Sequence, residues 1–479
     1  MQTFTPSNLP RMSQQPEFLP ANYVWLIAFV AAMGGLLFGY DWVVIGGAKP
    51  FYEAYFHLTS PRLIGWANSC ALIGCFSGAL AGGAIGNRFG RRRTLTLCAL
   101  LFAVSSALTG WAHLFAGFIF WRIAGGVAIG LASNVSPLYI AEISPAAWRG
   151  RLVSLNQLAL VIGILAAQIV NWGIARPVPA GATPQAIAAG WNAVYGWRWM
   201  FTAISLPASL FFLSSLWIPE SPRWLLLRGK EEQAAKILAR IGGVSYAAAE
   251  VSSIRAALAG SGRGAAGWRE LLAPGIRRRI LAGVALAALQ QWCGINILFN
   301  YAEEVYRSAG YGLNDLLFNI VITGAINLLF TAIAMFFVDR FGRRTLMLFG
   351  CLGVGFSHLC AGAAYKLGLH GAGVLVMTLC AIAFYAMSLA PVTWVLISEM
   401  FPNRVRGLAV SIAVAALWTA SFLLTYTFPI LNRLFGTADV FFLYAAICLL
   451  GAFFVYKCVG ETAGQSLEQI EGAAEAAGG

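Results

Sequence analysis

The segment WRIAGGVAIGLASNVSPLYIAEISPAAWRGR, residues 121–151, places one arginine at the start of a long apolar run. Arg122 is followed by an uncharged stretch over 123–141, which is close to the ~20 residues that a helix needs to cross a bilayer. Arg122 is therefore expected at membrane depth. An arginine there costs at least about 2.5 kcal/mol, so its side chain should face the interior of a helix bundle and contact an acidic or polar partner.

The sequence offers one obvious partner, Asp41, in the apolar segment LIAFVAAMGGLLFGYDWVVIGGA, residues 26–48. No other carboxylate of the chain is flanked by apolar residues for so long on both sides. Two interpretations of an Asp41–Arg122 pair stay open. It is either a fixed ion pair that joins two helices, or a site that gains and loses a proton, because burial favours the neutral acid while a guanidinium favours the carboxylate.

Composition indicates a protein that crosses the membrane many times. Hydrophobic residues make up 59% of the 479 residues and charged residues only 11%, against about 25% charged residues in soluble domains. The net charge of +13 comes from Lys and Arg in short segments between apolar runs, which indicates topology rather than nucleic-acid binding. The nine cysteines have no CxxC spacing, so neither a disulfide framework nor a metal site is expected.

Twelve apolar runs have membrane length, so we expect an all-α membrane protein with twelve transmembrane helices. The expected spans are 22–47, 63–86, 94–111, 116–140, 152–174, 197–218, 280–306, 313–338, 345–365, 371–398, 408–431 and 440–456. The expected organisation is an N-terminal segment 1–21, a six-helix half 22–218, a linker 219–279 with short amphipathic helices, a second half 280–456 and a tail 457–479.

Basic residues are concentrated in alternate connections between the runs. One set of connections holds the arginines of 88–93, of 149–151 and of the linker, whereas the other holds only scattered residues such as Lys49 and Arg433. The positive-inside rule therefore predicts a protein of the cytoplasmic membrane with both termini and the linker in the cytoplasm. Residues 1–20 lack a basic region before a short apolar core, so no cleaved signal peptide is expected.

The two halves repeat each other. GNRFGRRR at 86–93 returns as VDRFGRRT at 338–345, each between the second and third helix of its half. YIAEISPAAWRGR at 139–151 returns as VLISEMFPNRVRGLA at 395–409. A duplicated six-helix unit is typical of a transporter built from two pseudo-symmetric halves that rock around a central site.

The repeated motifs place arginines beside carboxylates at the predicted cytoplasmic helix ends. Such groups can make charge-assisted hydrogen bonds when the inner face is closed. The expected latch has one set in each half: Arg88, Arg91, Glu142 and Arg149 in the first, and Arg340, Arg343, Glu399 and Arg406 in the second. The alternative is that these charges only set the topology.

The seventh expected span carries several amides, which are costly in a membrane unless they find partners or line a wet cavity. They are Gln290, Gln291, Asn296 and Asn300, and Gly294 offers a kink that brings them toward one cavity. Gln157, Asn327, Trp394 and Trp418 add amides and indoles from other spans. This combination suits a neutral polyhydroxylated ligand such as a sugar, whereas the alternative is that the amides only join helices.

Several motifs together resemble the sugar porter family of the major facilitator superfamily. They are FGYDWVVIGG, GNRFGRRR, the 121–151 segment, PESPRWLLLRG, QQWCGIN, VDRFGRR and SEMFPNRVRG. The resemblance implies the major facilitator fold and a sugar site that includes Phe38, Gln157, Gln290, Gln291, Asn296, Asn327 and Trp394. It also implies a proton-coupling role for Asp41 opposite Arg122, and we add Glu220 and Arg223 of the PESPR segment to the expected cytoplasmic gate.

We therefore expect a symporter that imports a hexose or pentose with a proton, working as a monomer in the lipid bilayer without a cofactor or nucleic acid. Two alternatives stay open: an uncoupled facilitator of a sugar or polyol, and a transporter-like sugar sensor. An enzyme is not expected, because the sequence has no paired carboxylates or Ser-His set and its four histidines are scattered.

Overall fold

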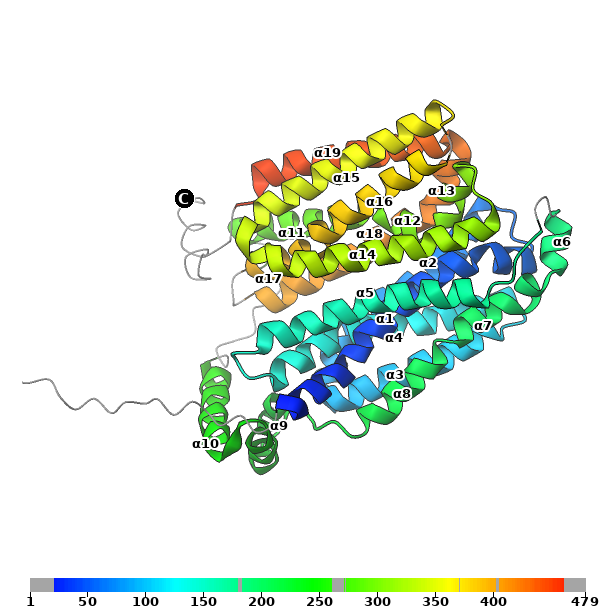
Figure 1. Ribbon diagram of the computed structural model, residues 1–479. Helices are drawn as coiled ribbons and strands as arrows, with labels where there is room; N and C mark the ends of the chain where they lie inside the picture. Colours follow the sequence, from blue (N-terminus) through cyan, green and yellow to red (C-terminus); the bar gives the residue numbers. More distant parts are fainter. Residues whose placement is uncertain are drawn as a thin grey trace, which may run out of the picture.

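The computed structural model describes residues 21–179, 183–260, 271, 273–369, 371–401 and 405–460, and this described part contains helices and no strand. The N-terminal segment 1–20 and the end of the tail, 461–479, lie outside the described residues, so the predicted location of both termini is not addressed. The helices form two bundles that lie side by side, α1–α8 and α11–α19 (Figure 1).

The first bundle contains α1 (Ala21–Tyr55), α2 (Pro61–Phe89), α3 (Arg91–Gly110), α4 (Phe115–Ile143), α5 (Arg149–Ile174), α6 (Pro184–Ala189), η1 (Asn192–Gly196), α7 (Trp197–Thr202) and α8 (Ser205–Ser215). The second contains α11 (Pro274–Trp292), α12 (Ile295–Asn300), α13 (Ala302–Ser308), α14 (Leu313–Phe341), α15 (Arg343–Lys366), α16 (Ala372–Met387), α17 (Leu389–Glu399), α18 (Arg406–Phe435) and α19 (Thr437–Cys458). This confirms the predicted all-α fold of two halves.

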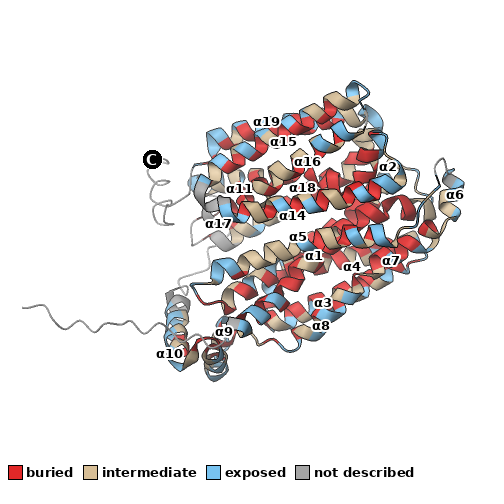
Figure 2. Ribbon diagram, viewed as in Figure 1, coloured by how far each residue is buried: buried red, intermediate tan, exposed pale blue. Residues whose placement is uncertain are grey.

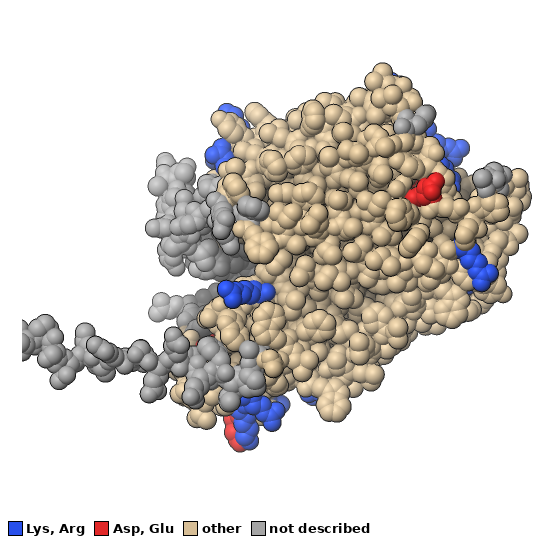
Figure 3. Space-filling model, viewed as in Figure 1, with Lys and Arg blue, Asp and Glu red and all other residues tan. Residues whose placement is uncertain are grey.

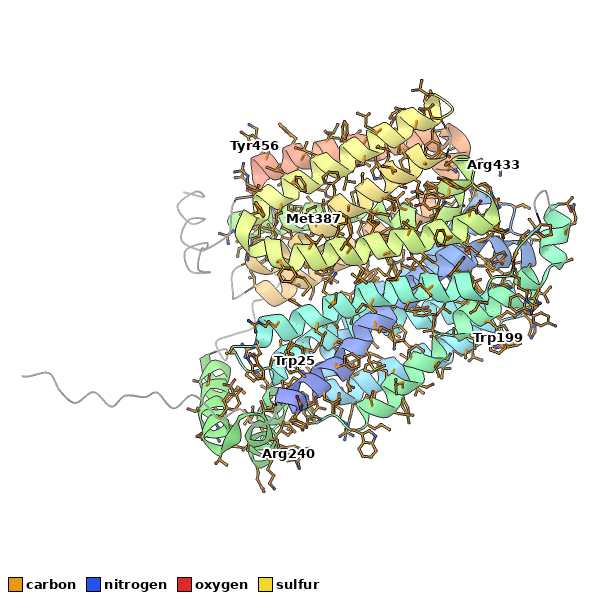
Figure 4. All side chains as sticks on the ribbon, in the orientation of Figure 1. Trp25, Trp199, Arg240, Met387, Arg433 and Tyr456 are labelled. Carbon is orange, nitrogen blue, oxygen red and sulfur yellow. The ribbon has the colours of Figure 1, made fainter. Side chains whose placement is uncertain are left out.

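The two remaining helices, α9 (Pro222–Leu227) and α10 (Glu231–Gly260), lie at one end of the first bundle, where α1 begins and α8 ends (Figure 1). Gly243 lies inside α10 with a φ of 85°, so this helix is two segments joined by a bend. We call this end of the molecule the α10 end and the opposite one the far end. Arg240 and Tyr456 lie at the α10 end, and Trp199 and Arg433 lie at the far end (Figure 4).

Eleven helical segments of the described part are long and apolar enough to cross a membrane. The sixth expected span, 197–218, instead consists of two shorter helices, α7 and α8. Pro207 explains the interruption, because it has no N–H to donate to the carbonyl of Ala203. The spans of the second half also contain interruptions, at Gly294 between α11 and α12 and at Ser388 between α16 and α17.

Pro391 explains the second of these interruptions, since it cannot donate to the carbonyl of Met387. The corresponding first and fourth helices of the other half, α1 and α4, continue without a break although each contains a proline, Pro50 and Pro137. Breaks of this kind are therefore found in only one of the two halves along the described first and fourth spans.

Burial and charge follow the pattern of a membrane protein. Buried residues face the interior of the bundles, whereas exposed residues lie on the outer surfaces (Figure 2). Large apolar side chains such as Leu206, Phe336 and Leu450 remain exposed there, as lipid contact requires. On the face drawn in Figure 3, Lys, Arg, Asp and Glu lie at the two ends, with an uncharged belt between them.

The repeated RFGRR motifs form two matching turns. Gly90 ends α2 with a φ of 99°, and Gly342 ends α14 with a φ of 79°. A positive φ is easily adopted only by glycine, so each motif turns the chain sharply from the second helix of its half into the third. The turns lie at the α10 end and position the arginines that follow them.

Candidate functional site

Asp41 of α1 and Arg122 of α4 form a buried ion pair inside the first bundle. Arg122 Nη1 lies 2.7 Å from Asp41 Oδ1, and the two side chains are 3% and 2% exposed. The guanidinium also lies over the ring of Phe201 in α7, at 5.3 Å. Asp41 Oδ2 is buried and has no hydrogen-bond partner among the described residues. One oxygen of the carboxylate is thus held by the arginine, while the other has no donor.

Three of the predicted amides form a continuous hydrogen-bonded chain. Gln291 Nε2 donates to Gln290 Oε1 at 2.5 Å, and Asn296 Nδ2 donates to Gln291 Oε1 at 2.5 Å. Gln290 Nε2 in turn donates to the hydroxyl of Tyr385 in α16 at 3.0 Å, and Asn296 Nδ2 lies 3.3 Å from Ser421 Oγ in α18. The chain crosses the break at Gly294, so residues on both sides of that break contribute to one polar surface.

Two aromatic residues meet where the halves face each other. The rings of Phe38 in α1 and Trp418 in α18 lie 6.0 Å apart at an interplanar angle of 45°. Trp418 Nε1 is buried and has no hydrogen-bond partner among the described residues. An apolar ring face next to an unused N–H donor can contact both the carbon face and a hydroxyl of a sugar.

The other predicted ligand residues are not joined to this chain of amides. Asn300 and Asn327 are buried, and Gln157 is half-buried, but no hydrogen bond between described residues connects them to Gln290, Gln291 or Asn296. Trp394 in α17 is 41% exposed and likewise makes no hydrogen bond with the amides in the described part. These four residues therefore remain candidate sugar ligands on the basis of the sequence, without a hydrogen bond to the amide chain.

Sequence reasoning identified Asn327 but missed the polar stripe on α14 to which it belongs. Asn319, Thr323, Asn327 and Thr331 are all buried and follow one another at intervals of four, which places them on one face of the helix. Gln168 of α5 reaches this stripe from the other half, with its Nε2 3.4 Å from Thr323 Oγ1. The spacing itself was the signal, since an i, i+4, i+8, i+12 repeat of polar residues in an apolar span is costly unless it faces a partner.

At the α10 end, three of the predicted gate residues come together within the first half. Arg91 binds Glu142 of α4 through two nitrogens, Nε at 2.9 Å and Nη2 at 3.0 Å. Glu220 Oε1 accepts hydrogen bonds from the backbone N–H groups of Arg91 and Ser221 at 2.8 and 2.9 Å. Ser221 Oγ also donates to Glu142 Oε2 at 2.5 Å. This network joins the α2–α3 turn, α4 and the start of α9.

The exposed gate residues make no hydrogen bond to that network in the part of the chain that the structure describes. Arg88, Arg149 and Arg223 are exposed, and Arg343 is half-buried at the start of α15. The side chains of Arg340, Glu399 and Arg406 lie outside the described residues, so the latch of the second half is not addressed.

Arg149 of the first half lies near Tyr246 of α10. Burial raises the pKa of the Tyr246 hydroxyl to about 12; the nearby Glu250 raises this pKa further, and Arg149 opposes the shift.

A second ionic cluster, which the sequence analysis did not identify, joins the two halves at the far end. Lys49 of α1 contacts Glu53 on its own helix at 3.0 Å, and Glu303 and Glu304 of α13 at 3.3 and 2.5 Å. Arg307 pairs with Glu303 at 2.7 Å. We call these five residues the far-end clasp. Lys49 is only 2% exposed, so these carboxylates, rather than water, compensate its buried positive charge.

Other hydrogen bonds between the halves also lie toward the far end. Asn314 of α14 exchanges two bonds with the backbone of Val178, at 3.0 and 3.1 Å. Together with the clasp and the Gln168–Thr323 contact, these are the hydrogen bonds and ion pairs that link one half to the other among the described residues. The links between the halves that the described residues show therefore lie toward the far end.

Three comparisons relate this geometry to known proteins. A profile of the family described as "Sugar (and other) transporter" matches residues 27–474. The chain is similar to the D-xylose-proton symporter of Escherichia coli strain K12, with 39% identity over 482 residues that cover 94% of this chain and 96% of that protein. It is also 35% identical over 467 residues to the glucose facilitated diffusion protein of Zymomonas mobilis, which covers 93% of this chain and 96% of that protein.

Among solved structures, the fold is similar to the partially occluded inward open conformation of the xylose transporter XylE from E. coli. The TM-score is 0.82 at 37% identity, and the match covers 93% of this chain and 100% of that chain.

Proposed function

Because the chain belongs to the sugar porter family of the major facilitator superfamily, we propose that it imports a hexose or pentose together with a proton by alternating access. It is a membrane transporter rather than an enzyme. The observation that carries the coupling proposal is the buried Asp41, which has one oxygen bound to Arg122 and the other without a donor.

The chemistry of coupling follows from that geometry. An aspartate in a low-dielectric interior favours the neutral acid, and an adjacent arginine favours the carboxylate, so a change in their separation shifts the balance. A proton that crosses about 100 mV releases about 2.3 kcal/mol, which supports roughly 50-fold accumulation of the sugar. The proposed cycle therefore has enough driving force with one proton for each sugar.

The proposed sugar site lies between the halves, at the Gln290–Gln291–Asn296 chain and the Phe38–Trp418 pair. Amides donate and accept hydrogen bonds at once, as sugar hydroxyls do, and the two rings provide an apolar surface. Gln157, Asn300, Asn327 and Trp394 are proposed to complete the site when sugar is bound. A site with discontinuous helices at the interface of two repeats is typical of secondary transporters.

We further propose that the α10 end is cytoplasmic and the far end is extracellular, in the plasma membrane of the cell. The arginine-rich turns at the α10 end support this orientation through the positive-inside rule. The hydrogen bonds that join the halves at the far end, and the similarity to an inward open structure, support an inward-facing state with the extracellular side closed.

The decisive experiment is uptake into vesicles that contain the purified protein, with an imposed pH gradient and a panel of unlabelled pentoses and hexoses as competitors. Symport predicts accumulation that follows the pH gradient, and the competitor panel identifies the sugar. Uptake that only equilibrates and ignores the pH gradient would favour the facilitator, which is the second candidate because one relative is a facilitated diffusion protein.

A further inference from the structure

The helix break at Gly294 leaves backbone carbonyls without their normal partners, and Cys293 O is one of them. In a continuous α-helix, the N–H of Ile297 would donate to the carbonyl oxygen of Cys293. Here Gly294 has a φ of 84°, and Ile297 N donates instead to the oxygen of Gly294 at 3.1 Å. Cys293 O is therefore a buried acceptor that the helix itself does not satisfy, and such an acceptor requires a donor from elsewhere.

His358 of α15 is placed to supply that donor. Its Nε2 lies 2.9 Å from Cys293 O, and because a carbonyl can only accept, Nε2 carries the hydrogen. The side chain is 1% exposed, and it comes from a helix that is 65 residues away along the chain. Cys448 Sγ of α19 also faces Cys293 O at a longer distance, 3.7 Å.

Aromatic residues of α19 fix the imidazole in this position. The ring of Phe441 lies 5.3 Å from it in an edge-on arrangement, and the ring of Tyr444 lies 6.2 Å from it. Tyr444 also contacts the break itself, because a Cβ on Gly294 would lie 2.8 Å from its ring. The angle between α11 and α12 is therefore determined by His358 and Tyr444 together with the backbone of Gly294.

That angle matters because the polar chain of the proposed sugar site crosses the break. Gln290 and Gln291 precede Gly294, Asn296 follows it, and the hydrogen bonds between their amides are only 2.5 Å long. A small rotation of α12 relative to α11 would separate Asn296 from Gln291. We propose that His358 is a positioning residue for sugar binding: it holds the broken helix at the angle that aligns these three amides. This inference rests on the proposed function.

Two substitutions separate positioning from simple packing. His358→Phe keeps a ring between Phe441 and Tyr444 but has no donor for Cys293 O, whereas His358→Gln retains an amide donor of similar reach. The assay is equilibrium binding of the sugar identified by the competitor panel to purified protein, together with thermal unfolding. We expect about a tenfold weaker Kd for His358→Phe, which corresponds to about 1.4 kcal/mol and lies within the cost of leaving a buried acceptor unpaired, and a Kd within about threefold of wild type for His358→Gln.

Ser357→Ala is the matched control. Ser357 is the adjacent buried residue of α15, and its hydroxyl donates to Gly353 O at 2.8 Å within the same helix. This control should leave the Kd unchanged even if it lowers the unfolding temperature. Dependence of uptake on the pH gradient should persist in His358→Phe, because Asp41 and Arg122 are intact.

The results that would refute the positioning role of His358 differ from those that would refute the proposed function. A wild type that binds no sugar would refute the function itself. A wild type that binds sugar while folded His358→Phe binds it equally well would overturn the positioning role. If His358→Phe does not fold, His358→Asn replaces it, because the shorter amide falls short of Cys293 O; equal affinities of His358→Asn and His358→Gln would then overturn the proposal.

Discussion

Asp41 permits a test that separates sugar binding from proton coupling. An Asp41→Asn side chain has the same size and can still form hydrogen bonds, but it cannot exchange a proton. We expect this variant to bind sugar, and to exchange labelled sugar at equal concentrations, while it loses accumulation against a gradient. The measurement is uptake into vesicles with an imposed pH difference, beside an exchange assay on the same vesicles.

The stability of this variant must be established first. Asparagine leaves the guanidinium of Arg122 buried without a counter-ion, which costs on the order of 3 to 5 kcal/mol. The double variant Asp41→Asn/Arg122→Gln removes both charges and is the control for that effect. Accumulation by a folded Asp41→Asn protein in step with the pH difference would contradict a coupling role for Asp41.

Gln290 is the member of the amide chain that also binds Tyr385. Gln290→Ala removes the hydrogen bond to Tyr385 and the one from Gln291. We therefore expect about a tenfold weaker Kd for sugar, with little change in membrane insertion. Trp292→Phe is the control, because its indole N–H donates to Ala420 O and makes no hydrogen bond to the amides among the described residues. Binding that is unchanged in Gln290→Ala would favour the interpretation that the amides only join helices.

Single residues could be predicted from the sequence where the membrane restricted their options. Arg122 had one plausible partner in an apolar run, and the structure places the two side chains 2.7 Å apart. Lys49 was missed because its partners Glu303 and Glu304 are 254 residues or more away and lie at a predicted helix end, where charges are common. Spacing along one helix shows which face a residue occupies, but it does not show which distant helix lies opposite.

The network around Arg91 connects three elements, the α2–α3 turn, α4 and α9. Arg91→Lys keeps the charge but loses the two-pronged bond to Glu142 and the bonds to Gly86 O and Asn87 Oδ1. We expect the midpoint of thermal unfolding to fall by several degrees. Arg88→Lys, an exposed position on the same turn, should leave the midpoint unchanged. Equal midpoints for both variants would mean that the network contributes little to stability.

Helix count could be predicted from apolar runs, whereas helix continuity could not. The twelve expected spans are represented in the fold, yet the sixth is divided and two spans of the second half are interrupted. Pro207 and Pro391 remove backbone donors without changing the hydropathy of their runs, so a count of apolar residues does not detect them. Gly294 was the exception, because its position among amides already suggested a kink.

The far-end clasp makes a prediction about the whole transport cycle. Lys49→Gln leaves Glu53, Glu303 and Glu304 close together without their buried cation, which destabilises the closed far end. We therefore expect the population to shift toward a state with the far end open. Spin labels at His113→Cys and Leu369→Cys lie on exposed far-end loops of the two halves. Double electron–electron resonance should report a longer distance between them in Lys49→Gln than in the wild type.

Arg307→Gln is the control for this measurement, because Arg307 pairs with Glu303 of its own helix and does not link the halves. Cys458 is exposed and must be replaced by serine before labelling. A distance distribution in Lys49→Gln that matches both wild type and Arg307→Gln would show that the clasp does not hold the far end closed.

In the first and fourth spans, the confinement of the helix breaks to one half has a mechanical consequence. Continuous helices such as α1 and α4 resist bending along their length, whereas α11–α12 and α16–α17 lack backbone hydrogen bonds at their interruptions and depend on neighbouring side chains to hold their angle. The first and fourth helices of the first half would therefore stay stiff, and elastic strain during each turnover would accumulate in the corresponding helices of the second half. Backbone amides beside Gly294 and Ser388 should then exchange their hydrogens with water faster than those along α1 and α4, so that one wall of the transport pathway is rigid and the other compliant.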